Sequence, residues 1–330
     1  WTFAEDKYIV TGAGGTGIGV RTVAYRAKKI NRVTLSGTKT WTGRTFVDGA
    51  SVNMTESYFA NNSEVTVRNG GILDLAADGV FKKFRYISYR VSEESFLRCR
   101  GNFAIDNGDK LVVDGGSVVY ADNSKNAYFN DVTLLNGGTI IGGDGIGIAY
   151  QESSTWHMIG GSPISVGVPI RLTYYYEGTM FTVNADTDLT FTGSVKSKST
   201  FEGLPLRKRG AAKLTFGVGA DIPKSPVLLE AGTLAFLSNS SVKSLALTGT
   251  GTIEVAAGAT LAIGDSSSRS WPGTGILEFF EADRKSIRFG TDASALTAAQ
   301  LSRVRLNGSS AKLDANGYLV KDVGLMLLFR

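Results

Sequence analysis

The chain has 330 residues, a formal net charge of +5 and one cysteine. One cysteine excludes an internal disulfide and any metal site built from several cysteines, and so small a positive charge does not by itself indicate a nucleic-acid partner. Glycine supplies 41 residues, well above the usual share of about 7%. No apolar run approaches the roughly 18 residues that a membrane helix needs, so we expect no membrane-spanning segment.

The first notable feature is a glycine pattern in residues 8–29. Gly12, Gly14 and Gly17 match G-x-G-x-x-G, the turn that holds a dinucleotide in Rossmann folds. That fold also needs a carboxylate about 20 residues later and long helices between the strands, and the sequence offers neither. The run GGTGIGV (14–20) recurs almost unchanged as GGDGIGI (142–148), where no cofactor signature accompanies it. We therefore interpret the pattern as a glycine turn and expect no nicotinamide cofactor.

Turn-then-strand units recur along the rest of the chain. The units are NGGILDL (69–75), DGGSVVY (114–120), NGGTIIG (136–142), IGGSPISV (159–166), EAGTLAFL (230–237), TGTIEVA (250–256), AAGATLAI (256–263) and GTGILEFF (273–280). Gly70, Gly115, Gly137 and Gly160 are 45, 22 and 23 residues apart, so the first step spans about two of the others. A period in the low twenties is typical of one coil of a parallel β-solenoid.

Apolar and polar positions alternate between these turns. Leu73 and Leu75 alternate with Ile72 and Asp74, which predicts one face toward the coil interior and one toward solvent. A β-sandwich or barrel also has short strands and glycine turns, but its spacing falls near 8–12 residues. The sequence therefore favours an all-β fold, a single-stranded parallel β-helix with coils of about 22 residues.

We expect one continuous domain with a cap at each end. Its parts are an N-terminal cap and first coils (1–50), the solenoid body (51–290), and a C-terminal cap with a terminal apolar strand (291–330). Short helices are expected at most near 21–29 and 294–304. The second would present Leu296, Ala299 and Leu301 toward one side and cover part of the C-terminal end as a short capping helix.

A more specific pattern lies in residues 204–242. It approximates a Lys-x-Gly-x-Gly-x-Leu-x-Leu strand that is followed, about twenty residues later, by a Gly-Thr-Leu strand. The matching residues are Lys208, Gly210, Leu214 and Phe216, then Gly232, Thr233 and Leu234, with Ala212 in place of the second glycine. This pattern resembles the autotransporter-associated β-strand repeat.

The segment 287–320 resembles the closing segment of secreted bacterial proteins that carry such repeats. A helical LTAAQL turn precedes a final LNG…KLDANGYL stretch. Together the two resemblances cover about 204–320, roughly a third of the chain. They imply a secreted or surface-exposed bacterial β-solenoid, often adhesive or structural, and they imply little about chemistry.

Parallel β-helices also include polysaccharide lyases and hydrolases, so an enzyme is the main alternative. The carboxylate signatures of such hydrolases are absent, and the single histidine, His157, lies in STWHMIG between Trp156 and Met158. A packed or rim histidine is the more ordinary interpretation. Five aspartates could gather on one face of adjacent coils, but turn positions explain them better. These are Asp106, Asp109, Asp114, Asp122 and Asp131. We assign no catalytic, cofactor-binding or metal-binding residue.

Two stretches are rich in aromatic side chains: 80–90, where lysines and arginines lie between the rings, and 172–178, which holds three consecutive tyrosines. Exposed tyrosines and tryptophans stack on sugar rings, and cations between aromatics can hold an acidic glycan. Candidate glycan contacts are Lys82, Arg85, Tyr174, Tyr176 and Trp271. A strand with aromatic residues inward and solvated cations outward explains the first stretch better, and an aromatic ladder along the coils is the more ordinary explanation of the second.

The last segment, 323–329, lacks alternation. Five large apolar residues follow one another: Leu325, Met326, Leu327, Leu328 and Phe329. Both faces of such a strand require burial, either inside its own solenoid or against a neighbouring subunit. A head-to-tail contact of the second kind does not close and would form a filament.

The sequence therefore predicts a secreted or cell-surface structural or adhesive solenoid without enzymatic activity, which self-associates through its ends. The alternatives are a polysaccharide-active enzyme and a glycan-binding spike.

Overall fold

The computed structural model describes most of the chain. The described residues are 7–10, 19–21, 32–35, 45–49, 51–54, 64–75, 88–92, 96–99, 104–105, 110–120, 127–129, 131–142, 146–148, 154–172, 178–197 and 203–322. The chain forms two compact units, unit 1 (Trp1–Ile170) and unit 2 (Arg171–Arg330). The predicted domain limits at 50 and 290 stay predictions.

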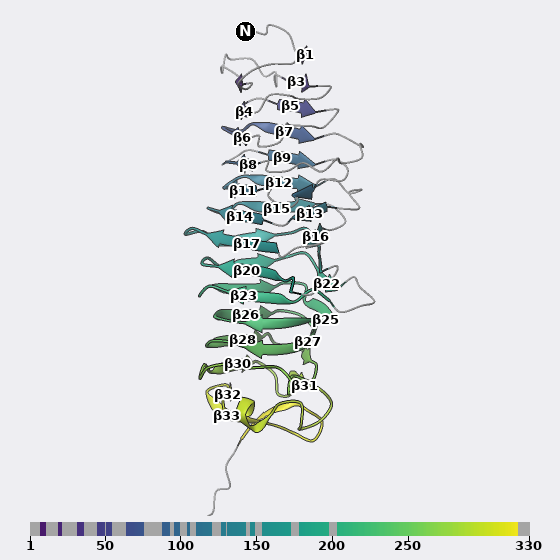
Figure 1. Cartoon of the computed structure of the whole chain (residues 1–330), viewed down its shortest axis with the longest axis vertical. Coiled ribbons are helices and arrows are strands. Elements are labelled where there is room, and N and C mark those ends of the chain that lie inside the picture. The colour runs from purple at the N-terminus through teal and green to yellow at the C-terminus, as the bar shows by residue number, and fades with distance from the viewer. Residues whose placement is uncertain are drawn as a thin grey trace, which may run out of the picture. The chain divides into compact units, whose positions relative to one another are not determined.

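Unit 1 is built from short strands that return to the same positions coil after coil (Figure 1). One stack contains β1 (Lys7–Val10), β3 (Arg32–Leu35), β5 (Ser51–Met54), β7 (Ile72–Leu75), β9 (Phe96–Cys99), β12 (Ser117–Tyr120), β15 (Thr139–Gly142) and β18 (Ile164–Val166). A second stack contains β2 (Gly19–Arg21), β4 (Thr45–Asp48), β6 (Glu64–Arg68), β8 (Ser88–Val91), β11 (Lys110–Asp114), β14 (Asp131–Leu135) and β17 (Ser154–Ile159). Shorter strands form a third: β10 (Ala104–Ile105), β13 (Ala127–Phe129) and β16 (Ile146–Ile148).

Unit 2 repeats this arrangement, and β19 (Ile170–Leu172) spans the boundary between the units. Its first stack contains β21 (Leu189–Phe191), β24 (Lys213–Phe216), β26 (Gly232–Phe236), β28 (Gly251–Val255), β30 (Leu277–Glu281) and β32 (Val304–Leu306). The other strands are β20 (Phe181–Ala185), β22 (Val195–Ser197), β23 (Leu206–Arg209), β25 (Ala220–Leu229), β27 (Ser240–Leu247), β29 (Leu261–Ile263) and β31 (Ile287–Phe289).

The strand pairing confirms the predicted parallel β-solenoid. Within each unit, successive coils pair in parallel. One column of partners in unit 1 is Arg32, Ser51, Ile72, Phe96, Ser117 and Thr139, and one in unit 2 is Lys213, Thr233, Thr252, Glu278 and Arg305. The step is 19 residues from Thr233 to Thr252 and 27 from Glu278 to Arg305, so coil length varies around the predicted 22.

The core of each unit lies inside the coils, where alternate side chains stack on their equivalents. In unit 2, Phe191, Phe216 and Phe236 form a column with ring centroids 6.0 and 5.1 Å apart. The predicted alternation holds for Leu73, which is fully buried, but Asp74 is also buried rather than exposed. Asp74 pairs in register with Asn53 of the preceding coil, and its burial departs from the predicted alternation.

Glycines at the predicted turns adopt the backbone conformation that requires them. Asn69 and Gly70 have φ angles of 53° and 73°, and Asn136 and Gly137 have 50° and 79°. Asn and Gly are the residues that tolerate this left-handed region best. The turn-then-strand interpretation of these segments is therefore confirmed.

The C-terminal end of unit 2 changes from parallel to antiparallel pairing. β32 pairs in parallel with β30 and antiparallel with β33 (Ser309–Leu313), which in turn pairs with β34 (Leu319–Lys321). The turn between β33 and β34 also reaches β31, because the Phe289 N–H donates to the Gly317 carbonyl at 2.8 Å. Both β31 and β32 therefore have partners from the last described residues, which cover this end of the coil.

A single-turn helix, α1 (Ala298–Leu301), is the one helix in the described ranges and falls inside the predicted 294–304 segment. Leu296 is buried, as expected, and Leu301 is half-buried, but Ala299 is exposed. Gln300 takes the inward position instead, since the helix is too short for the apolar spacing to set its face. Near the other end, Arg21 ends strand β2, and residues 22–29 of the other predicted helix lie outside the described residues.

Candidate functional site

The most unusual polar group in the described structure is Lys208 on β23. Its register partners are Val183 on β20 and Leu229 on β25, both buried and apolar, so the alternation of β23 places a lysine among core positions. The side chain is 0% exposed. A buried ammonium must find hydrogen-bond acceptors, because burying a bare charge is very costly.

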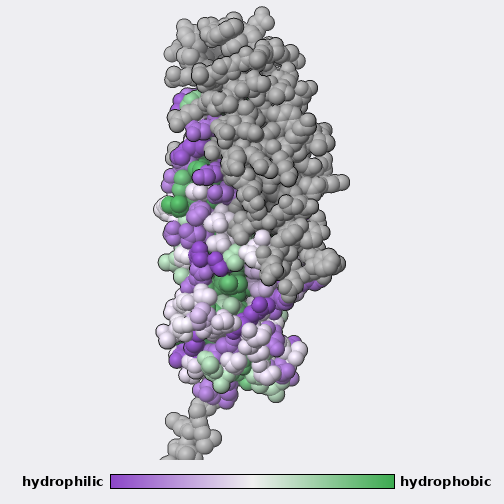
Figure 2. Space-filling view, in the orientation of Figure 1, coloured by the Kyte–Doolittle hydropathy of each residue, from purple (hydrophilic) through white to green (hydrophobic). Residues whose placement is uncertain are grey.

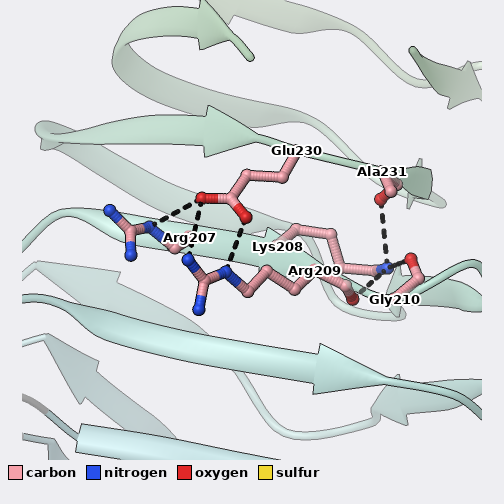
Figure 3. Close-up of polar contacts among 6 residues, drawn as sticks. All are labelled: Arg207, Lys208, Arg209, Gly210, Glu230 and Ala231. Atoms are coloured by element: carbon pink, nitrogen blue, oxygen red, sulfur yellow. Dashed lines mark hydrogen bonds and ion pairs between the residues drawn. The ribbon is translucent and has the colours of Figure 1, made fainter. Parts of the chain in front are cut away.

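Three backbone carbonyl oxygens accept hydrogen bonds from the Lys208 ammonium (Figure 3). The carbonyls of Arg209 and Gly210 lie at 2.7 Å, and that of Ala231 lies at 3.3 Å. The first two belong to the turn that ends β23, and the third belongs to the equivalent turn of the next coil. Lys208 therefore joins two successive turns from inside the coil.

Burial lowers the pKa of Lys208 from its usual 10.5 to about 8. Removal from water disfavours the charged amine, and this is the largest effect. The carboxylates of Asp186 and Asp188 act in the opposite direction and raise the pKa.

On the outward-facing side of β23, Glu230 bridges two arginines (Figure 3). Its carboxylate lies 3.2 Å from Arg207 Nε and accepts a hydrogen bond from Arg209 Nε at 2.5 Å. Arg207 and Arg209 lie on β23, and Glu230 follows the paired segment of β25. The bridge therefore joins the same two coils on the outside that Lys208 joins on the inside.

Unit 1 uses polar side chains in the same way. Asp48 accepts hydrogen bonds from Arg68 Nη2 at 2.9 Å and from Asn69 Nδ2 at 2.6 Å, one coil later. Asp114 accepts from Arg90 of the preceding coil and from Asn136 of the following coil. These asparagines occupy the left-handed turns, so turn geometry and inter-coil bonding are supplied by the same residues.

The predicted site residues fall largely outside the described part of the chain. Those outside are Lys82, Arg85, Tyr174, Tyr176, Leu325, Met326, Leu327, Leu328 and Phe329, together with Asp106, Asp109 and Asp122. Of the turn aspartates, Asp114 serves the inter-coil contacts described above, and Asp131 begins β14. His157 lies on β17, half-buried beside the fully buried Trp156, which agrees with a packed or rim histidine.

Trp271 is the described member of the candidate glycan contacts. Its indole N–H donates to the Leu245 carbonyl at 3.2 Å, and the Arg303 guanidinium lies 5.7 Å from its ring centroid. Arg303 also donates to the carbonyls of Trp271 at 2.6 Å and Gly275 at 2.7 Å. The tryptophan is half-buried and helps to hold its own loop, which leaves only part of the ring accessible to a ligand.

Gln300 is a polar residue that the sequence did not single out. Its Nε2 donates to the carbonyls of Ser266 and Arg269 at 3.0 and 2.9 Å. Its Oε1 accepts from the Thr297 N–H at 2.7 Å and completes a capping box. The Thr-x-x-Gln spacing was the available signal. One side chain thus fixes both the helix and the loop beneath it.

Replacing Gln300 with alanine is expected to lower the free energy of unfolding by about 2–3 kcal/mol, because two carbonyls and a helix N–H lose their partner. Urea denaturation followed by circular dichroism measures the loss. Ala299→Ser changes an exposed residue of the same helix and should alter stability by less than about 0.5 kcal/mol. Equal effects of the two substitutions would contradict this role of Gln300.

The described surface carries few large apolar side chains. Those exposed are Ile141, Ile159, Val218, Leu237, Ile276 and Phe280. On the coloured part of the face drawn in Figure 2, apolar atoms form small groups among hydrophilic residues. Small apolar groups of this kind are ordinary for a protein surface and identify no docking site.

No three His, Cys, Asp or Glu side chains of the described residues are grouped so that they could hold a metal ion. No helix among them has the length and apolar character needed to cross a membrane.

Comparison of the chain with known protein families, with curated proteins and with solved structures finds no match. The resemblance of residues 204–320 to autotransporter-associated repeats therefore stays a prediction.

Proposed function

We propose that the chain is a secreted or cell-surface bacterial protein with a structural or adhesive role. The observation that carries the proposal is the use of charged groups to join coils. Lys208 binds the carbonyls of two turns, and Glu230 binds two arginines of the preceding coil. Such contacts suit a scaffold that must keep its shape in solvent. The resemblance of residues 204–320 to repeats of secreted solenoids supports the same placement.

The proposed ligand of an adhesive role is a surface glycan. Its candidate contacts are Lys82, Arg85, Tyr174, Tyr176 and Trp271, which combine rings for stacking on sugars with cations for acidic groups. Replacing Lys82 and Arg85 together with alanine should weaken binding to an acidic polysaccharide at least tenfold. Lys321→Ala, which removes an exposed lysine elsewhere, is the matched control. Equal binding of both variants would overturn the glycan assignment.

Self-association is proposed to use the terminal segment 323–329. Within unit 2 the edge of β32 is already paired with β33, so a second copy cannot extend the stack there without displacing it. The five consecutive apolar residues that follow are the remaining candidate for strand addition. At about 25 cal/mol per Å², burying them contributes several kcal/mol to assembly.

Truncation after Asp322 is expected to shift the protein from polymers to monomers while its β-type circular dichroism spectrum is retained. Sedimentation velocity and electron microscopy of both forms measure the shift. If the truncated protein unfolds, the segment belongs to its own core. A full-length protein that stays monomeric at high concentration would also refute the assembly proposal.

Two measurements test the functional class: the location of the protein on its source cells and its activity on polysaccharides. Antibodies should label intact source cells, and the purified protein should release no reducing ends or unsaturated products from a panel of acidic and neutral polysaccharides. Labelling only after lysis would refute surface display. Saturable product release would replace the structural role with the enzymatic alternative.

A further inference from the structure

The buried ammonium of Lys208 has the same number of donors as it has carbonyl partners. A protonated amine has three N–H groups, and the partners are the carbonyls of Arg209, Gly210 and Ala231. A neutral amine keeps only two N–H groups. Loss of the proton must therefore release one carbonyl, even if the side chain does not move.

The distances indicate which carbonyl is released. The two bonds to the turn of β23 are 2.7 Å long, whereas the bond to Ala231, on the next coil, is 3.3 Å long. The longest bond is the weakest, so it is lost first. It is also the bond that connects the two coils.

We propose that Lys208 is a proton-dependent tie between successive coils of unit 2. When protonated, it binds the turns of both coils, and when neutral, it binds only its own. The Glu230 bridge to Arg207 and Arg209 on the outside of the coil does not involve Lys208, so it joins the two coils independently of the inner tie.

The charged side chains near Lys208 belong to three successive coils. Asp186 and Asp188, from the turn of the preceding coil, favour the protonated form. Arg207 and Arg209, on the same strand as Lys208, are positively charged. Glu230 of the next coil forms ion pairs with both of them. The neighbours of Lys208 on β20 and β25, Val183 and Leu229, carry no charge. Burial in this apolar column lowers the pKa to about 8.

The proposal is tested by nuclear magnetic resonance of the folded full-length protein between pH 6 and 11. The Lys208 side-chain nitrogen should titrate near pH 8, below its usual pKa of 10.5. Over the same range, the carbonyl carbon of Ala231 should shift more than those of Arg209 and Gly210. Titration of Lys208 near its usual pKa of 10.5 would overturn the proposal. So would an Ala231 signal that does not follow the lysine.

Denaturation provides a second readout. The folded pKa lies below the unfolded value, so unfolding takes up a proton between about pH 8 and 10.5, and stability rises with pH there. The unfolding equilibrium constant of the wild type should fall up to about tenfold per pH unit relative to Lys208→Met. A pH-independent difference between wild type and Lys208→Met would refute the tie, and if that variant does not fold, the resonance titration decides.

Discussion

Replacing Gly210 with alanine is expected to lower the free energy of unfolding of unit 2 by about 3 kcal/mol or more. Gly210 has a φ of 78°, a conformation that costs an L-residue about 1–2 kcal/mol. An added Cβ would also press against the backbone carbonyl of Ala185 on the preceding coil, at a separation that real Cβ atoms do not show. The coils would have to separate at the turn that Lys208 ties. Urea denaturation measures the loss.

Gly258→Ala separates the two contributions. Gly258 has a similar φ of 75°, but an added Cβ meets nothing within 4 Å. This substitution should therefore cost only about 1–2 kcal/mol, the conformational part alone. If the two alanine variants are equally stable, close packing between the turns of successive coils is not what requires glycine at position 210.

Replacing Phe216 with alanine is expected to cost about 3–5 kcal/mol. Phe216 is buried at 1% exposure, between Phe191 of the preceding coil and Phe236 of the following one. Because the ring contacts both neighbours, its removal leaves a cavity shared by three coils. The midpoint of thermal or urea unfolding should fall accordingly, with retention of the β-type spectrum below the transition.

Phe280→Ala is the matched control for this prediction. Phe280 lies on β30, one residue from the buried Phe279, but points outward with 47% exposure. Its removal should change stability by less than about 1 kcal/mol. A larger loss at Phe280 than at Phe216 would mean that the inner and outer faces of these strands have been exchanged.

The fold could be predicted because its two determinants are local. A turn needs residues such as Asn69 and Gly70 that adopt a positive φ, and a strand inside a coil needs apolar residues at every second position. Both patterns are visible in the sequence, and their spacing near 22 residues distinguishes a stacked coil from a sandwich. Coil length varied more than expected because bends and loops lengthen a coil without changing the register of its strands.

The polar contacts could not be predicted, because they depend on which residues meet after stacking. The Lys-x-Gly pattern marks Lys208 in the sequence. The inward orientation of the lysine and its bond to Ala231 follow only from the pairing of β23 with β25. Gln300 and Asp74 were missed for a related reason, since alternation and helical spacing assign apolar residues to buried positions and polar ones to solvent. Once covered by a neighbouring segment, a polar residue can be buried wherever hydrogen-bond partners are supplied.

The central claim is that stacking brings residues about one coil apart into direct contact and that polar side chains such as Lys208 join those coils. A crystal structure of the full-length protein at about 2 Å resolution tests it most directly. We expect Lys208 Nζ within hydrogen-bond distance of the carbonyls of both Gly210 and Ala231, and the rings of Phe216 and Phe236 stacked about 5 Å apart. A solvent-exposed Lys208, or β24 and β26 not paired in parallel, would contradict the account.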